Sequence, residues 1–193
     1  AFPDDPGGYR EDLEFMLGSA LLIAPVYDDS DQRRVYLPPG EWVDFWTHQR
    51  HVGPAHLAVH APLDTLPLFV RAGSIIPMMG EANRIPETRI DPLILQVYPA
   101  QEMRYILLED EGATEFSGGL DDQTFTFGWR GGTERAYHLR IVGLKGEVRS
   151  MHLRTADGQQ ISLSDWQQSD DSALNIRLLR TADAQVTIYL AGA

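Results

Sequence analysis

Residues 57–77, LAVHAPLDTLPLFVRAGSIIP, carry the clearest structural signal in this sequence. Short apolar runs alternate with Pro62, Pro67, Gly73 and Pro77. This punctuation favours short strands separated by fixed turns and disfavours helices. We therefore expect this part of the chain to be built from β-strands.

The sequence before this stretch shows the same rhythm. The apolar runs there are SALLIAPV (19–26), VYLP (35–38) and EWVDFW (41–46). Pro39 and Gly40 predict a turn between the second and third of them. One short segment differs: the spacing of its apolar residues favours a helical turn over 10–17.

After a polar, proline-containing linker predicted at 81–87, the strand rhythm resumes. Residues 137–142 alternate between apolar and polar types, and so do residues 186–190, which is typical of half-buried strands. Strands recur every 8 to 15 residues or so, with Gly or Asp between them, as in antiparallel sandwiches. The predicted strands lie in LILQVYP, MRYILLED, QTFTFGWR, RAYHLRIVG, EVRSMHLR, QQISL, ALNIRLLR and AQVTIYL.

Three motifs resemble the C-terminal part of glycoside hydrolase family 31, the α-glucosidase and α-xylosidase family. They are EFMLGSALLIAPV (14–26), VYLPPGEWVDFWT (35–47) and the opening stretch at 57–77. Phe2 to Asp4 is similar to the family's F-P-x-D loop, and 93–112 is a looser match. Glu14 stands where the family usually has Gln.

This resemblance implies an all-β fold of two consecutive antiparallel β-sandwich domains after a short remnant of a (β/α)8 barrel. The expected boundaries are 1–18 for the barrel tail, 19–83 for the proximal sandwich and 84–193 for the distal one. The two catalytic carboxylates of the family lie on earlier barrel strands, and the nucleophile belongs to a motif that this sequence lacks. No catalytic residue is therefore carried over.

Composition excludes several classes of function. The net charge is −12, so a nucleic-acid backbone would be repelled by most of the surface. The longest apolar run, 17–26, is too short for a membrane span. The chain has no cysteine, which excludes disulfides and thiolate metal sites and weakly favours a reducing compartment. It starts at Ala1, so we expect a piece of a longer protein.

Acidic clusters are the first candidates for a catalytic or metal-binding site within this chain itself. They occur at 28–31, 109–111, 121–122 and 170–171. All lie at predicted turns, and neighbouring residues on a strand point to opposite faces, so we interpret them as solvated turn acids. A weak calcium site at Asp28, Asp29 and Asp31 is the alternative, but further loop ligands are missing.

Histidines and aromatic residues are the other candidates. His48, His51, His56 and His60 lie close together, and the last two would share a strand face. We interpret them as surface or loop histidines and expect no metal or cofactor site. Trp42, Phe45 and Trp46 are predicted to fill the proximal core, whereas Phe127 and Trp129 are the better candidates for exposed sugar-stacking groups.

The leading interpretation is a non-catalytic C-terminal region that braces the catalytic barrel of a parent enzyme hydrolysing α-linked glucosides or xylosides. The alternative is a carbohydrate-binding module that docks polymeric α-glucan. The expected partner is the barrel of the same polypeptide. Without the barrel, Phe15, Met16 and Leu17 should form an apolar patch that promotes self-association.

Overall fold

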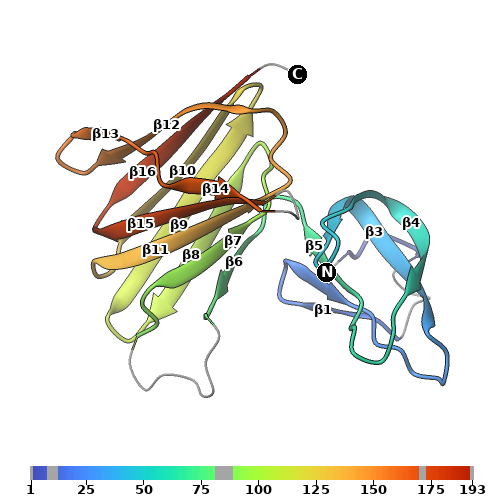
Figure 1. Ribbon diagram of the computed structural model, residues 1–193. Coiled ribbons are helices and arrows are strands. Elements are labelled where there is room, and N and C mark those ends of the chain that lie inside the picture. Colours follow the sequence, from blue (N-terminus) through green and yellow to red (C-terminus); the bar gives the residue numbers. More distant parts are fainter. Residues whose placement is uncertain (1, 8–12, 81–88, 170–172, 192–193) are drawn as a thin grey trace. The chain divides into compact units, whose positions relative to one another are not determined.

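The computed structural model describes residues 2–7, 13–80, 89–169 and 173–191, and these residues form strands and turns without a helix (Figure 1). The all-β prediction is therefore confirmed. None of these residues belongs to a helix long and apolar enough to cross a membrane. The chain separates into two compact units, Ala1–Ala72 and Gly73–Ala193.

The first unit contains one antiparallel sheet with the strand order β1-β2-β5-β3-β4. Its pairing shifts register between Leu37 and Gly40, where the predicted turn is instead an irregularity inside one long strand. Prolines are tolerated at such a bulge because no ladder hydrogen bond is needed there. The strands are β1 (Phe15–Leu17), β2 (Leu21–Ile23), β3 (Gln32–Asp44), β4 (Arg50–His60) and β5 (Leu68–Arg71).

The beginning of the chain differs from expectation. The helical turn predicted at 10–17 is wrong for Phe15–Leu17, which forms β1 and pairs with β2. The barrel remnant expected at 1–18 is likewise not confirmed, since β1 belongs to the sheet of the first unit. Alternation of exposed and half-buried residues explains the strand, because one face of β1 packs on the sheet core.

The second unit is a sandwich of two sheets with the strand orders β13-β12-β16-β10-β9-β8 and β14-β15-β11-β7-β6 (Figure 1). Its pairs are antiparallel except for β7 and β11, which run parallel. Its strands are β6 (Ile75–Met78), β7 (Leu93–Val97), β8 (Met103–Glu109), β9 (Gly112–Asp121), β10 (Thr124–Gly131), β11 (Arg135–Val142), β12 (Val148–Thr155), β13 (Gln160–Ser162), β14 (Trp166–Gln168), β15 (Ala173–Thr181) and β16 (Ala184–Leu190).

The division between the units falls earlier in the chain than the boundary expected at 83/84. Strand β6 pairs with β7 and therefore belongs to the second unit. The linker expected at 81–87 lies outside the described residues. Strand β9 was not predicted because it contains Gly118 and Gly119. A Cβ at Gly118 would lie 2.1 Å from the Thr126 carbonyl oxygen of β10, so the close pairing requires glycine.

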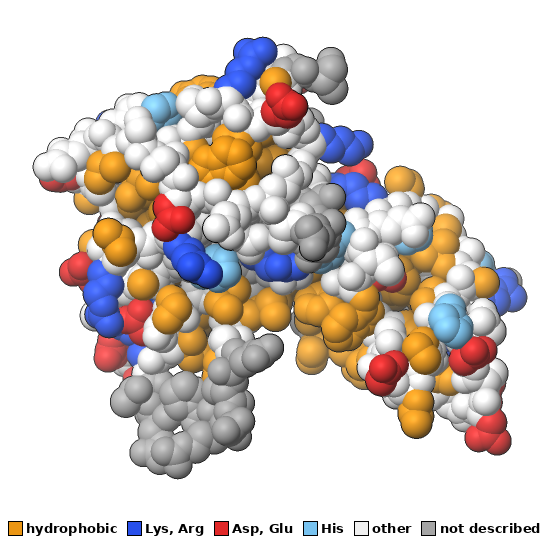
Figure 2. All heavy atoms as spheres, in the orientation of Figure 1, with side chains coloured by type: hydrophobic (Ala, Val, Ile, Leu, Met, Phe, Trp, Pro, Cys, Tyr) orange, Lys and Arg blue, Asp and Glu red, His pale blue; other side chains and the backbone are white. Residues whose placement is uncertain are grey.

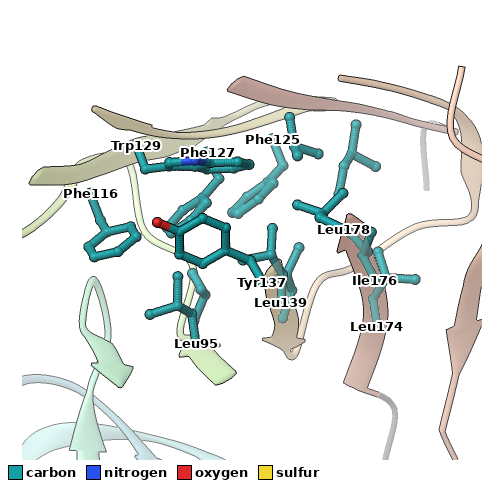
Figure 3. Close-up of a cluster of buried hydrophobic side chains, with 14 of the residues drawn as sticks. Leu95, Phe116, Phe125, Phe127, Trp129, Tyr137, Leu139, Leu174, Ile176 and Leu178 are labelled. Atoms are coloured by element: carbon teal, nitrogen blue, oxygen red, sulfur yellow. The ribbon is translucent and has the colours of Figure 1, made fainter. Parts of the chain in front are cut away.

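Side chains from both sheets fill the core of the second unit (Figure 3). The alternation predicted for 137–142 is confirmed, since Tyr137, Leu139 and Ile141 point inward and are buried. The ring centroids of Tyr137 and Trp129 lie 4.8 Å apart. Figure 3 shows these residues facing one another between the sheets: Leu95, Phe116, Phe125, Phe127, Trp129, Tyr137, Leu139, Leu174, Ile176 and Leu178.

The buried phenol of Tyr137 makes stability depend on pH. Burial raises the pKa of Tyr137 from its ordinary value of 10.0 to about 12. The unfolded chain loses this proton first, so the free energy of unfolding should fall as the pH rises from about 10 to about 12, by at most ~1.4 kcal/mol per pH unit. Urea unfolding at several pH values measures this slope. Tyr137→Phe should flatten it, and an unchanged slope in that variant would contradict the assignment.

Candidate functional site

An exposed apolar stripe runs along β1, the edge strand of the first unit. Leu13, Phe15 and Leu17 expose 46%, 53% and 57% of their surfaces. The apolar patch predicted at Phe15, Met16 and Leu17 is thus exposed at Phe15 and Leu17, but the prediction is wrong for Met16, which packs against the core of this unit. The Glu14 side chain is only 5% exposed. We call Leu13, Phe15 and Leu17 the β1 stripe. Apolar side chains gathered on an edge strand are typical of a surface that another protein segment covers.

A buried ion pair fixes the direction of the β1 stripe. Glu14 Oε2 accepts a hydrogen bond from the Tyr36 backbone N–H at 3.2 Å and lies 3.9 Å from Arg33 Nη2. Arg33 also donates to the Leu13 carbonyl oxygen at 3.3 Å. Leu13 and Glu14 lie just before β1; within the strand side chains alternate, so the inward Met16 leaves Phe15 and Leu17 outward. The sequence indicated only that Glu14 replaces the family's usual Gln.

The loop before β1 is held by a second polar contact. Tyr36 Oη donates to Asp5 Oδ1 at 2.8 Å, and the Gly7 backbone N–H donates to the same oxygen at 3.1 Å. Asp5 is buried, and a buried carboxylate needs such donors. Sequence reasoning noted the Phe-Pro start of this loop but missed the role of Asp5. Asp5 and Gly7 are therefore anchored to Tyr36 of β3.

The acidic clusters named in the sequence analysis lie in different structural environments. Asp28 lies in an exposed turn, where Ser30 Oγ and the Ser30 N–H donate to it at 2.6 and 3.0 Å and hold its pKa below the usual range. Asp28, Asp29, Asp31 and Asp64 line a cavity of about 620 Å³ together with neighbouring loop residues. Within the described ranges, no group of three His, Asp or Glu residues is placed to hold a metal ion.

In the cluster at 109–111, Asp110 and Glu111 lie in an exposed turn as predicted, but the prediction of a solvated turn acid is wrong for Glu109. Glu109 is the last residue of β8, and it forms an ion pair with Arg135, whose side chain is 1% exposed. Glu111 pairs with Arg89 at 3.2 Å and accepts a hydrogen bond from Thr133 Oγ1 at 2.6 Å. Both carboxylates thus neutralise arginines from distant parts of the sequence. Residues 170–171 lie outside the described residues.

The histidines occupy separate environments on and around β4. His56 and His60 share the exposed face of the strand, as predicted. The His56 ring centroid lies 4.9 Å from that of Tyr36, whereas His60 Nδ1 lies 3.5 Å from Asp31 Oδ2. His51 contacts Phe69 edge-on, with 5.9 Å between centroids. His48 closes the turn after β3 with a positive φ of 59°.

Of the aromatic residues predicted to fill the core of the first unit, Trp42 does so and Trp46 does not. Trp42 is fully buried in the core of the first unit, as expected. Trp46 is instead 52% exposed, and its Nε1–H donates to the Leu66 carbonyl oxygen at 2.7 Å. Phe127 and Trp129, named as the better candidates for exposed stacking groups, are instead buried, with 0% and 3% exposure. Both point inward because they share one strand face with Phe125.

Comparisons with known proteins agree with this all-β architecture. Residues 1–76 match the glycosyl hydrolase family 31 C-terminal domain. An α-xylosidase of Saccharolobus solfataricus is 39% identical over 115 residues, and the match covers 58% of this chain and 16% of that protein. A neutral α-glucosidase AB of Mus musculus is 33% identical over 151 residues, covering 76% of this chain and 15% of that protein.

The fold has solved counterparts. A family 31 dextranase of Flavobacterium johnsoniae, in complex with glucose, superposes with a TM-score of 0.83 at 22% identity, covering 97% of this chain and 28% of that chain. Fold and sequence matches together define an all-β C-terminal region of a glycosidase. The chain belongs to glycoside hydrolase family 31, as a part of its C-terminal region. It spans only 15% to 16% of the length of the two curated relatives named above.

Proposed function

We propose that this chain is the non-catalytic brace of an α-glycosidase that hydrolyses α-linked glucosides or xylosides. In this proposal the β1 stripe packs against the catalytic domain of the same polypeptide. The names of the relatives, α-xylosidase and α-glucosidase, supply the class of substrate.

The β1 stripe is the observation that carries this proposal. Phe15 and Leu17 expose more than half of their surfaces on an edge strand. Burying each of them would contribute roughly 1.5–3 kcal/mol. Figure 2 shows hydrophobic side chains reaching the visible surface at several places among charged and polar ones. Strand β1 differs from these places because each of its outward side chains is apolar. The buried ion pair of Glu14 and Arg33 also holds the chain in place directly before the strand.

The carboxylates described above support a structural role as well. A retaining glycosidase needs two carboxyl groups about 5–5.5 Å apart that face one sugar. Glu109 and Glu111 are engaged with arginines, and Asp28 is engaged with Ser30. These acids hold strands and turns together.

The test removes the stripe while keeping the fold. Phe15→Asp combined with Leu17→Asp should abolish association of this chain with the catalytic domain supplied as a separate polypeptide, measured by analytical ultracentrifugation. The same variant should abolish self-association of the isolated chain and its binding of a hydrophobic dye. Charges on exposed positions should leave the circular dichroism spectrum of the chain unchanged.

A matched control is available on another edge strand. Ile106 and Leu108 of β8 are also two residues apart and exposed. Ile106→Asp combined with Leu108→Asp should leave association with the catalytic domain intact. Equal losses in both double variants would refute a specific role for the β1 stripe. Hydrolysis of an aryl α-glucoside or α-xyloside by the isolated chain above background would refute a non-catalytic role.

A further inference from the structure

A small polar cavity lies across three strands of the second unit. Its volume is about 110 Å³, which is room for a few water molecules or one edge of a larger ligand. Strands β11, β14 and β15 provide its walls, together with Asp165, which directly precedes β14. It is lined by His138, Asp165, Trp166, Gln167, Asn175 and Arg177.

Strand register brings these side chains together. His138 lies opposite Arg177, and Asn175 lies opposite Gln167. Their neighbours Leu139 and Ile176 are buried in the core. Because side chains alternate along a strand, His138, Asn175 and Arg177 point to the outer face of the sheet. The cavity is thus a surface feature made by polar side chains from distant parts of the chain.

One ring nitrogen in this cavity lacks a protein partner. Nε2 of His138 is buried and forms no hydrogen bond within the described part of the chain. Burial lowers the pKa of His138, and the charges of Arg177 and Arg140 lower it further, while a hydrogen bond with Asn175 opposes the shift. The imidazole is therefore neutral at pH 7. The ring therefore adds no positive charge to the cavity, and its buried Nε2 is out of reach of a ligand in this structure.

A larger and more apolar cavity continues from the polar one. Its volume is about 620 Å³, and it shares Asp165 and Arg177 with the polar cavity. Ile161, Leu163 and Leu179 line it, and Ile161 and Leu179 are exposed. The two cavities together form one surface with a polar end and an aliphatic end. We call this surface the β11–β15 cleft.

We propose that the β11–β15 cleft binds a neutral oligosaccharide, with the edge of one sugar unit in the polar cavity. Each sugar hydroxyl both donates and accepts hydrogen bonds, and the exposed amide of Gln167 offers both functions. The Asn175 amide already donates to Ser169 Oγ at 3.1 Å and to the Ala173 carbonyl oxygen at 3.2 Å, so it shapes the wall of the cavity. The carbon-bound hydrogens of the following units would lie on the aliphatic end. This binding site is separate from the β1 stripe, so it goes beyond the bracing function.

Charge favours a neutral ligand over an anionic one. Asp165 and Arg177 both line the polar cavity and also both line its apolar continuation. Their opposite charges offset each other at the junction of the two cavities. An anion would gain from Arg177 but would be repelled by Asp165. A polyhydroxyl ligand uses both groups, since the carboxylate accepts hydrogen bonds and the guanidinium donates them.

The test is a titration of the ¹⁵N-labelled chain with maltoheptaose and, separately, with a neutral xyloglucan oligosaccharide. We expect chemical-shift changes at Gln167, Asn175 and Arg177 and at the His138 ring. Gln167→Ala combined with Arg177→Ala should weaken binding by about tenfold or more, because it removes one neutral and one charged hydrogen-bonding partner. Both residues are exposed, so the variant should fold.

A matched control replaces the same residue types outside the cleft. Arg154 of β12 pairs in register with Gln160 of β13, both are exposed, and neither lines the cleft. Arg154→Ala combined with Gln160→Ala should leave the dissociation constant unchanged. Binding of neither sugar, or equal weakening in both double variants, would overturn the proposal. It would also be overturned if inorganic phosphate bound at these residues more tightly than either sugar.

Discussion

Phe127→Ala is expected to destabilise the second unit by about 3–5 kcal/mol, which is the usual cost of removing a buried phenylalanine. Phe127 is fully buried, and its ring centroid lies 6.2 Å from that of Phe116 and 6.5 Å from that of Phe125. Alanine would leave a cavity between the two sheets, whose packed side chains can collapse only in part (Figure 3). The loss of stability should be largest for the strands of the opposite sheet that contact the Phe127 ring.

The unfolding of the first unit should not change in this variant, because its core consists of other residues. Hydrogen exchange read by mass spectrometry separates the two units, since peptides from each report their own free energy of opening. Tyr189→Ala is the control: this aromatic side chain lies on β16 of the same sheet and is 45% exposed. It should change stability by only about 0.5 kcal/mol. Equal losses from Phe127→Ala and Tyr189→Ala would contradict the assigned core.

Glu109→Ala should have the next largest effect. The guanidinium of Arg135 is buried, forms an ion pair with Glu109, and donates to the Ile90 carbonyl oxygen at 3.3 Å. Its Nε has no partner among the described residues. Removing Glu109 would leave a buried cation without its counter-charge. Breaking a buried pair costs 3–5 kcal/mol or so, and we expect about 3 because the Glu109 side chain remains 25% exposed.

A double variant distinguishes loss of the pair from loss of packing. Glu109→Ala combined with Arg135→Met should recover part of the stability, because an apolar side chain of similar length needs no counter-charge. Glu115→Ala is the surface control, since Glu115 pairs with Arg104 and Arg130, whose side chains are exposed. Its effect on the free energy of unfolding should be small. If Glu109→Ala were no more destabilising than Glu115→Ala, the buried pair would not stabilise the fold.

Much of the strand pattern could be predicted because alternation is a local property. The period of two at 137–142 reflects one buried face and one outer face, and the structure confirms it. The same rule, applied to Phe125, Phe127 and Trp129, would have placed all three in the core. The nearby Gly128, Gly131 and Gly132 suggested an exposed turn instead. Strand β10 nevertheless runs through Gly128 to Gly131.

The candidate sites were harder to predict because each depends on partners that are distant in sequence. The family resemblance predicted that Phe15 and Leu17 are exposed, but nothing local indicated that Arg33 and Tyr36 of β3 hold Glu14 inward. Strand β14 has only three residues and no alternation long enough to detect, so nothing local indicated that Gln167 would lie beside Asn175. The proposed sugar cleft therefore had no signal in any single segment.

The amino-acid sequence by itself determined the family, the all-β class and most of the strands, because motif identity and side-chain alternation are written in consecutive residues. Only the tertiary structure decided which acids are paired, which aromatic residues are buried and where polar groups converge. Arg135 lies 26 residues from Glu109, and His138 lies 39 positions before Arg177. Contacts of this kind arise from strand order and register, since these determine which distant residues become neighbours.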